Sequence, residues 1–238
     1  MALAALTPSA GAKVSSSFDK QILTVAGGKG KDRMVVSCGA DGNAKVNGDD
    51  PGSGAVACSR VVEVDAQGGG GNDVIDFSAV TASFGSAEFP GFGTATGTAA
   101  VGGEGNDRFI PSKVAFNLFY GEGGNDHADG GPLRDLLSGG AGSDVLRGGD
   151  GRDSVLGNGG ADRLFGGADA DVVSGNADDD LLSGGAGDDA VFGGAGRDRL
   201  AGGPGGDKLV GGPGKDLLRG GSGNDTEIEA PPKKPAKP

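Results

Sequence analysis

One register dominates the second half of the chain, where residues 121 to 228 divide into twelve consecutive nonapeptides without insertion or deletion. Every unit begins with Gly, and its sixth residue is always Asp. A solvated run of charge would not keep a nine-residue register, so the repeat must be structural. The sixth-position residues are Asp126, Asp135, Asp144, Asp153, Asp162, Asp171, Asp180, Asp189, Asp198, Asp207, Asp216 and Asp225.

The eighth position of each unit is aliphatic, except in the first and last units, which carry Ala128 and Glu227. Side chains alternate between the two faces of a strand, so this pattern predicts a six-residue turn and a three-residue strand whose middle side chain points inward. Two units then make one 18-residue coil, and stacked coils form two parallel sheets. The predicted fold class is all-β: a parallel β-roll, or β-solenoid, with a β-rich N-terminal capping region.

Alternate aspartates should fall on opposite edges of the roll. One edge is expected to carry Asp126, Asp144, Asp162, Asp180, Asp198 and Asp216, and the other Asp135, Asp153, Asp171, Asp189, Asp207 and Asp225. Three isolated units precede the array, and they contain Asp32, Asp73 and Asp107. Asp107 and Asp126 are nineteen residues apart, which predicts an almost regular coil at the junction.

Four segments follow from these patterns. Residues 1–12 resemble the end of a signal peptide, which would leave Lys13 as the first residue of the mature chain. Residues 13–120 hold eight of the ten phenylalanines and are expected to cap and nucleate the roll. Residues 121–228 form the β-roll itself, and residues 229–238 are a Pro- and Lys-rich tail that we expect to be extended and disordered.

Composition narrows the class of partner. The formal net charge is −12, with 33 acidic against 21 Lys and Arg residues, which favours cations and disfavours nucleic acid. No stretch approaches the ~20 apolar residues of a membrane span. Cys38 and Cys58 flank several turn signals and favour a disulfide in an oxidising compartment, with two unrelated buried thiols as the alternative. These features predict a secreted, extracellular protein.

The repeat Gly-Gly-x-Gly-x-Asp-x-U-x, with U a large aliphatic residue, resembles the RTX, or haemolysin-type, calcium-binding repeat. The resemblance implies that each Ca²⁺ sits between two stacked turns, held by aspartates and by backbone carbonyls. The implied ligands are the twelve aspartates of the array together with Asp32, Asp73 and Asp107. Ca²⁺ takes six to eight oxygen ligands, and a Gly-rich turn can present several carbonyls to it. Five gaps on each edge of the array would hold up to about ten ions.

Stacked carboxylates repel one another, so we expect folding to be coupled to calcium binding. Position four is Leu133, Asp169 or Asp178 in three units, and position two is Glu122, Asn158 or Asn176 in three, one unit carrying both Asn176 and Asp178. A branched leucine tolerates positive φ poorly, so the site beside Leu133 is expected to be distorted or empty. Glu227 suits a polar last coil that blocks further stacking.

Catalysis is the main competing function. His127 is the only histidine, which excludes a His-Glu-x-x-His zinc site, and it is most simply an outward strand residue. We therefore expect a non-enzymatic protein. A carboxylate-based polysaccharide-active enzyme, a structural or adhesive module with a purely structural ion, and a calcium-independent solenoid stay open as alternatives. The register of aspartates disfavours the last, and a cell-surface or polysaccharide partner is left undetermined.

Overall fold

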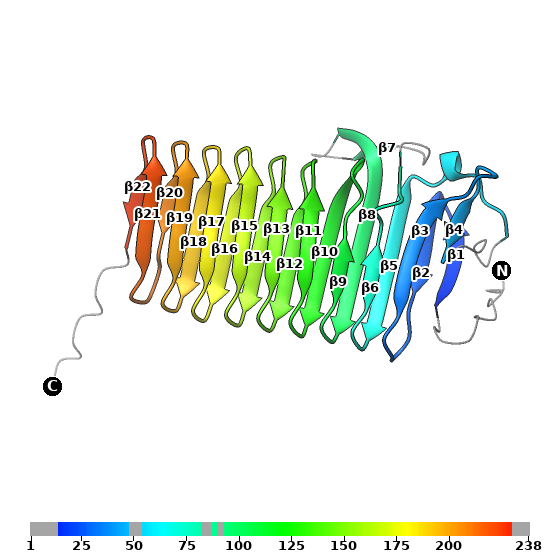
Figure 1. Ribbon diagram of the computed structural model, residues 1–238, viewed down its shortest axis with the longest axis horizontal. Helices are drawn as coiled ribbons and strands as arrows, with labels where there is room; N and C mark the ends of the chain where they lie inside the picture. Colours follow the sequence, from blue (N-terminus) through cyan, green and yellow to red (C-terminus); the bar gives the residue numbers. More distant parts are fainter. Residues whose placement is uncertain (1–13, 48–53, 82–86, 90–92, 230–238) are drawn as a thin grey trace.

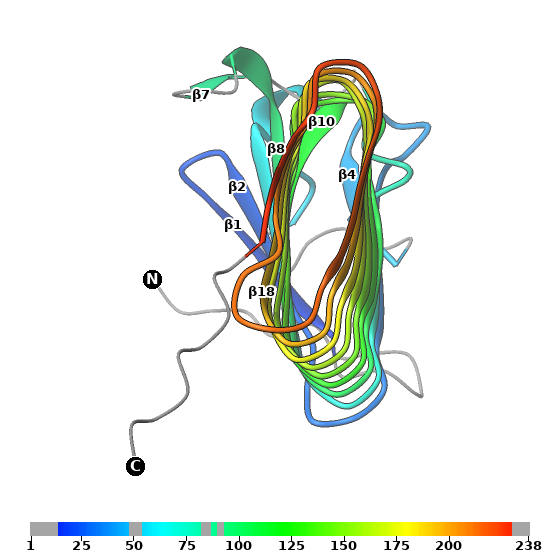
Figure 2. The same cartoon turned by 90° about the vertical axis from the view of Figure 1, so that its left-hand side faces the viewer.

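The computed structural model describes residues 14–47, 54–81, 87–89 and 93–229, with side chains left out at 87–89 and 93–96. The predicted signal-peptide remnant and residues 230–238 of the predicted tail lie outside these residues. Successive coils stack side by side into an elongated body, as Figure 1 shows. Viewed along the stack in Figure 2, the coils overlie one another as flattened rings with two long sides and two rounded edges.

The two long sides are two β-sheets. The twelve-stranded sheet comprises β1 (Ser15–Asp19), β2 (Ile22–Ala26), β5 (Glu63–Gly70), β7 (Ala87–Phe89), β8 (Gly93–Glu104), β10 (Ala115–Gly123), β12 (Leu136–Ala141), β14 (Ser154–Gly159), β16 (Val172–Ala177), β18 (Ala190–Ala195), β20 (Lys208–Val210) and β22 (Thr226–Ile228). The ten-stranded sheet comprises β3 (Arg33–Cys38), β4 (Ala44–Val46), β6 (Val74–Asp76), β9 (Arg108–Ile110), β11 (His127–Gly131), β13 (Val145–Gly149), β15 (Arg163–Ala168), β17 (Leu181–Ala186), β19 (Arg199–Pro204) and β21 (Leu217–Ser222).

Pairing is parallel throughout the array, with an offset of 18 residues between neighbours. The fold class predicted from the repeat, an all-β parallel solenoid, is confirmed. The β-rich N-terminal half predicted from the sequence is parallel as well where β2, β5, β8 and β10 pair in turn. Three antiparallel pairs add to it, namely β1 with β2, β3 with β4 and β7 with β8.

The strands are longer than predicted. Most strands of the array have five or six residues, not three, because the first three residues of the next nonapeptide stay in the sheet. In β14, for example, Asn158 and Gly159 still pair with Asn176 and Ala177 of β16. The turn is therefore confined to positions four to six of each unit.

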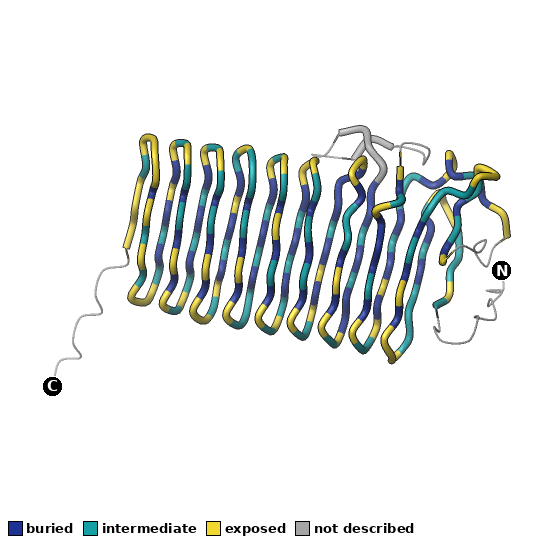
Figure 3. Tube along the Cα trace, viewed as in Figure 1, coloured by how far each residue is buried: buried dark blue, intermediate teal, exposed yellow. Residues whose placement is uncertain are grey.

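The core is a thin layer of aliphatic side chains from the two sheets. Leu137, Leu146, Val155, Leu164 and Val173 are all fully buried, and the rest of the eighth-position column follows them as far as Leu209. Figure 3 shows the resulting alternation of buried and less buried residues along each coil. Leu218 in the last coils is only partly buried, and Glu227 is exposed.

The N-terminal coils contain a broader, partly aromatic core. Phe109 stacks on Phe119 at 5.4 Å between ring centroids and meets Phe77 edge-on at 5.7 Å. Cys38 at the end of β3 forms a disulfide with Cys58, which confirms the predicted pairing. Cys58 begins a three-residue 3₁₀ turn, Cys58–Arg60, and no helix in the described part of the chain is long and apolar enough to cross a bilayer. The strand β10 crosses the predicted boundary at residue 120, so the coils on either side share the same sheets.

Candidate metal-binding edges

Each edge of the solenoid carries a ladder of aspartates. The backbone N–H of one aspartate donates a hydrogen bond to Oδ1 of the aspartate one coil further on. For Asp126 and Asp144 the N–O distance is 2.7 Å, and for Asp144 and Asp162 it is 2.8 Å. Each carboxylate therefore spans the gap between two stacked turns.

The first edge contains the six array aspartates expected there, extended upstream without interruption. Asp32 donates to Asp73, Asp73 to Asp107, and Asp107 to Asp126, each at 2.7 Å. The three upstream units, isolated in sequence, are thus consecutive rungs of one nine-aspartate ladder that ends at Asp216. The sequence spacing predicted the nearly regular coil from Asp107 to Asp126, which the structure has, but it did not place Asp32 and Asp73 because the segments between them have no fixed length.

The second edge contains the six other array aspartates, from Asp135 to Asp225. Its first rung is a residue that the sequence analysis missed. Asn117 donates its backbone N–H to Oδ1 of Asp135 at 2.6 Å, as an aspartate would. The signal was available, since Asn117 lies exactly one coil, 18 residues, before Asp135.

Asn117 is fully buried, and both polar atoms of its side-chain amide form hydrogen bonds. Its Nδ2 donates to the carbonyl oxygens of Gly130, Ala115 and Ser112 at 2.7, 3.2 and 3.3 Å, and to Oδ1 of Asp135 at 3.1 Å. Its Oδ1 accepts from Thr98 Oγ1 at 2.7 Å. The N-terminal end of the second ladder is thus closed by a neutral amide whose nitrogen faces four oxygens.

The second carboxylate oxygen of the ladder residues has a different environment. Oδ2 is buried and without a hydrogen-bond partner in Asp73, Asp107, Asp126, Asp135, Asp144, Asp153, Asp162, Asp171, Asp180, Asp189, Asp198 and Asp207. A buried charged oxygen without a partner costs more than the ~1–3 kcal/mol of a neutral group. These twelve atoms could therefore serve as ligands of a cation.

Glycine at the first position of each unit makes room for that oxygen. A Cβ at Gly121 would lie 2.1 Å from Oδ2 of Asp126 and 2.3 Å from the carbonyl oxygen of Gly139. Any side chain there would displace either the carboxylate or the next coil. The invariant first glycine is thus explained by the aspartate five residues later.

Burial raises the pKa of these carboxyl groups. It raises the pKa of Asp153 to about 8, against a backbone hydrogen bond from Asp135 that lowers it, and the neighbouring charges of Asp135 and Asp171 add to the rise. Burial likewise raises the pKa to about 7 for Asp126, Asp135, Asp171 and Asp180, and to about 6 for Asp107 and Asp162. A bound cation would favour the ionised form and reverse these shifts.

Left-handed backbone occurs at position two, near the end of most array strands, and at position four, in the turn. The substitutes Glu122, Asn158, Asn176, Asp169 and Asp178 all adopt it, with φ between 71° and 82°. Leu133 does not, although Asp135 beside it keeps its hydrogen bond to Asp153 at 2.7 Å. The turn at Leu133 therefore differs in backbone conformation, as its branched side chain predicts, while the ladder continues through it; whether an ion is lost there stays a prediction.

Side chains alone do not complete a calcium shell. In the described residues no three His, Cys, Asp or Glu side chains converge on one point. Ca²⁺ takes six to eight oxygens, so backbone carbonyls of the turns must supply most of them. His127 lies outside the ladders, half exposed on β11, where Nε2 is 3.7 Å from Asp129 and 3.3 Å from Nη1 of Arg147.

Comparison with known protein families gives one match. The profile of the RTX calcium-binding nonapeptide repeat matches residues 66–79, 116–137, 129–164, 138–173, 156–191, 165–200 and 192–227, which together cover more than half of the chain. A search of curated proteins found no match. The ladders, the glycine cradles and the family profile agree, and the chain belongs to the RTX calcium-binding nonapeptide repeat family.

Proposed function

We propose that the protein is a secreted, non-enzymatic calcium-binding solenoid whose folding depends on the ion. The observation that carries the proposal is the row of buried, unpartnered Oδ2 atoms along both edges. Bound Ca²⁺ would supply positive charge between stacked turns and so relieve the cost of those carboxylates. The ligands would be the ladder aspartates of both edges, including Asp32, Asp73 and Asp107, with turn carbonyls.

The number of ions follows from the ladders. Nine aspartates on the first edge enclose eight gaps, and six on the second enclose five. The upstream rungs raise the capacity above the ten gaps of the array. The gap between Asn117 and Asp135 is excluded because the amide nitrogen of Asn117 already lies among the oxygens there.

A structural role for the ion fits the arrangement better than a catalytic one. The carboxylates are buried and bonded to the next coil, so no substrate reaches them. His127 is the only histidine and lies on the outer face between Asp129 and Arg147. The disulfide between Cys38 and Cys58 and the family membership support an extracellular location.

Two neighbouring aspartates allow a matched test. Asp189 is a ladder residue with an unpartnered Oδ2, whereas Asp188 is exposed and accepts a hydrogen bond from the backbone of Gly206. Asp189→Asn should remove up to two bound ions, one on each side of its turn, and Asp188→Asn should remove none. Equilibrium dialysis with radioactive calcium measures the count, and circular dichroism of the metal-free protein during Ca²⁺ and Mg²⁺ titrations measures coupled folding. Equal ion counts in both variants would refute the proposed ligands.

A further inference from the structure

The two sheets present different outer faces. From β13 to β21 the ten-stranded sheet carries two outward columns: Val145, Arg163, Leu181, Arg199 and Leu217 in one, and Arg147, Phe165, Ser183, Ala201 and Arg219 in the other. We call this surface the arginine face. It holds four arginines and no acidic residue, on a chain of net charge −12.

The opposite face contrasts with it. From β12 to β20 the twelve-stranded sheet turns outward Leu136, Ser138, Ser154, Leu156, Val172, Ser174, Ala190, Phe192, Lys208 and Val210. Its one charge is Lys208, whose Nζ lies 5.8 Å from the centroid of the Phe192 ring. Positive charge is therefore concentrated on one side of the solenoid.

Three of the four guanidinium groups on the arginine face are outside any ion pair, although the charge of Arg199 helps to lower the pKa of Asp179. Arg163, Arg199 and Arg219 are exposed and form no ion pair with any residue that the structure describes. Arg147 lies 3.6 Å from Asp129 and over the ring of Phe165. In the first column arginine alternates with an aliphatic residue, so Arg163 and Arg199 are two strand spacings, about 10 Å, apart.

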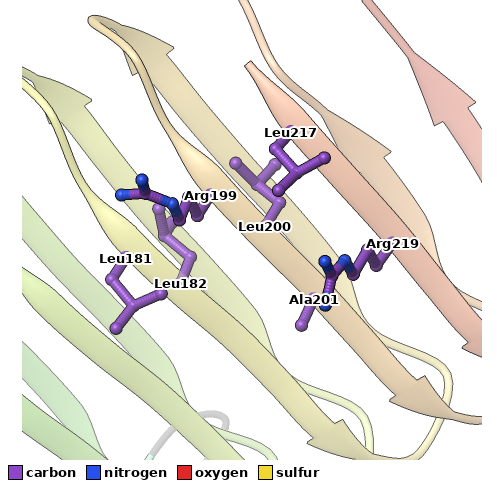
Figure 4. Close-up of a pocket in the computed structure, with 7 residues that line it drawn as sticks. All are labelled: Leu181, Leu182, Arg199, Leu200, Ala201, Leu217 and Arg219. Carbon is purple, nitrogen blue, oxygen red and sulfur yellow. The ribbon is translucent and has the colours of Figure 1, made fainter.

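Aliphatic side chains form the floor between the arginines. A hollow of about 220 Å³ is lined on this face by Leu181, Ala201 and Leu217, with Arg199 and Arg219 completing its wall. Leu182 and Leu200 also border it, but their side chains are buried in the core. Figure 4 shows Arg199 and Arg219 lying apart, with Leu200 and Leu217 between them in this view. Leu181 and Leu217 are 41% and 46% exposed, which leaves apolar surface open beside the positive charges.

From this arrangement we propose that the arginine face docks the solenoid onto an anionic lipid bilayer. Guanidinium groups bind phosphate oxygens, and the intervening leucines are placed to contact the acyl boundary below the headgroups. Because Arg163, Arg199 and Arg219 project from one sheet, they can meet a planar surface together. The exposed leucines favour lipid over a soluble polyanion, because a polyanion has no apolar part that could bury the side chains of Leu181 and Leu217.

Vesicle binding by the full chain in saturating Ca²⁺ tests the proposal. Wild type should co-sediment with vesicles of phosphatidylglycerol and phosphatidylcholine in equal parts, and not with phosphatidylcholine alone. Each arginine should contribute about fivefold, so Arg199→Gln combined with Arg219→Gln should weaken binding about 30-fold. Lys208→Gln removes one charge from the other face and should change binding less than twofold.

A second pair of variants separates lipid from other partners. Leu217 and Val172 are both 46% exposed, on opposite faces, so Leu217→Ser should weaken vesicle binding and Val172→Ser should not. If the double arginine variant binds vesicles as well as wild type does, the proposal is overturned. Such a result would be expected if Ca²⁺ bridged the acidic edges of the solenoid to the lipid. The proposal is also overturned if two results occur together: the protein binds dextran sulfate through the arginines, and Leu217→Ser leaves vesicle binding unchanged. Circular dichroism and calcium counts confirm that each variant is folded.

Discussion

Acidification should fold the calcium-free protein. The pKa of seven ladder aspartates lies at about 6 to 8 in the folded chain, against 3.8 as the ordinary value. A carboxyl group whose folded-state pKa is raised favours folding when protonated. The folded state therefore loses stability as the pH rises above about 4 and the carboxyl group would ionise in the unfolded chain. This loss reaches its full size above the folded-state pKa.

The magnitude is large. A rise in pKa from 3.8 to about 7 corresponds to about 4 kcal/mol at pH 8, and to about 2 kcal/mol if solvent near the turn halves it. At about 2 kcal/mol each, seven such groups reach about 14 kcal/mol, which is comparable with the ~5–15 kcal/mol by which a domain of this kind is usually stable. Without calcium, the array should be unfolded at pH 8 and folded at pH 5, with a midpoint between pH 6 and 7.

Far-UV circular dichroism in the presence of a chelator measures this transition. The calcium-saturated protein should behave oppositely, keeping its β signal at pH 8 and losing calcium on acidification, because protons compete for the same oxygens. Asp153→Asn removes the group with the highest pKa and should stabilise the metal-free fold at pH 8 while weakening calcium binding. A full β spectrum in chelator that does not change between pH 5 and pH 8 would refute the electrostatic reasoning.

Three further predictions concern single positions. Leu164→Ala removes a fully buried side chain from a core one layer thick and should lower the free energy of unfolding of the calcium-bound protein by about 2–5 kcal/mol, measured by denaturant titration. Gly148→Ala would bring a Cβ within 2.3 Å of Oδ2 of Asp153 and should cost at least ~1–3 kcal/mol and one or more ions, whereas Gly206→Ala, with 3.4 Å to its nearest neighbour, should cost neither. Asn117→Asp replaces the donating amide with a second carboxylate, so calorimetry should show one additional ion and chelator should destabilise this variant more than wild type.

The regular part of the fold was predictable because one repeated nonapeptide specifies the turn, the strand and the inward side chain of every half-coil. The sixth-position aspartate, the first-position glycine and the eighth-position aliphatic residue each have a single location in a coil, and the array follows from them. The strand length was predicted wrongly, because a glycine pair is typical of a turn although it stays in the sheet here, as where Gly167 of β15 pairs with Gly185 of β17.

The N-terminal coils were less predictable for a physical reason. The segments between Asp32, Asp73 and Asp107 are longer than one coil and differ in length, so they leave no fixed spacing in the sequence, although hydrogen bonds join the three aspartates directly. Asn117 was missed for another reason: it keeps the 18-residue spacing to Asp135, but an asparagine inside an aromatic strand does not look like a turn residue. Hydrogen bonds between neighbouring coils define these rungs.

The two ends of the solenoid differ in a way that bears on how such chains change length. The N-terminal end is closed by the disulfide, the aromatic core and Asn117, whereas every later coil repeats one 18-residue unit on the coil before it. Duplication or loss of a unit between Asp144 and Asp198 would lengthen or shorten the body by one strand spacing, about 4.8 Å, and leave both faces in register. The number of coils can therefore change by recombination between similar repeats, while the N-terminal coils stay the same. Each added coil would fold on the one before it in the same way.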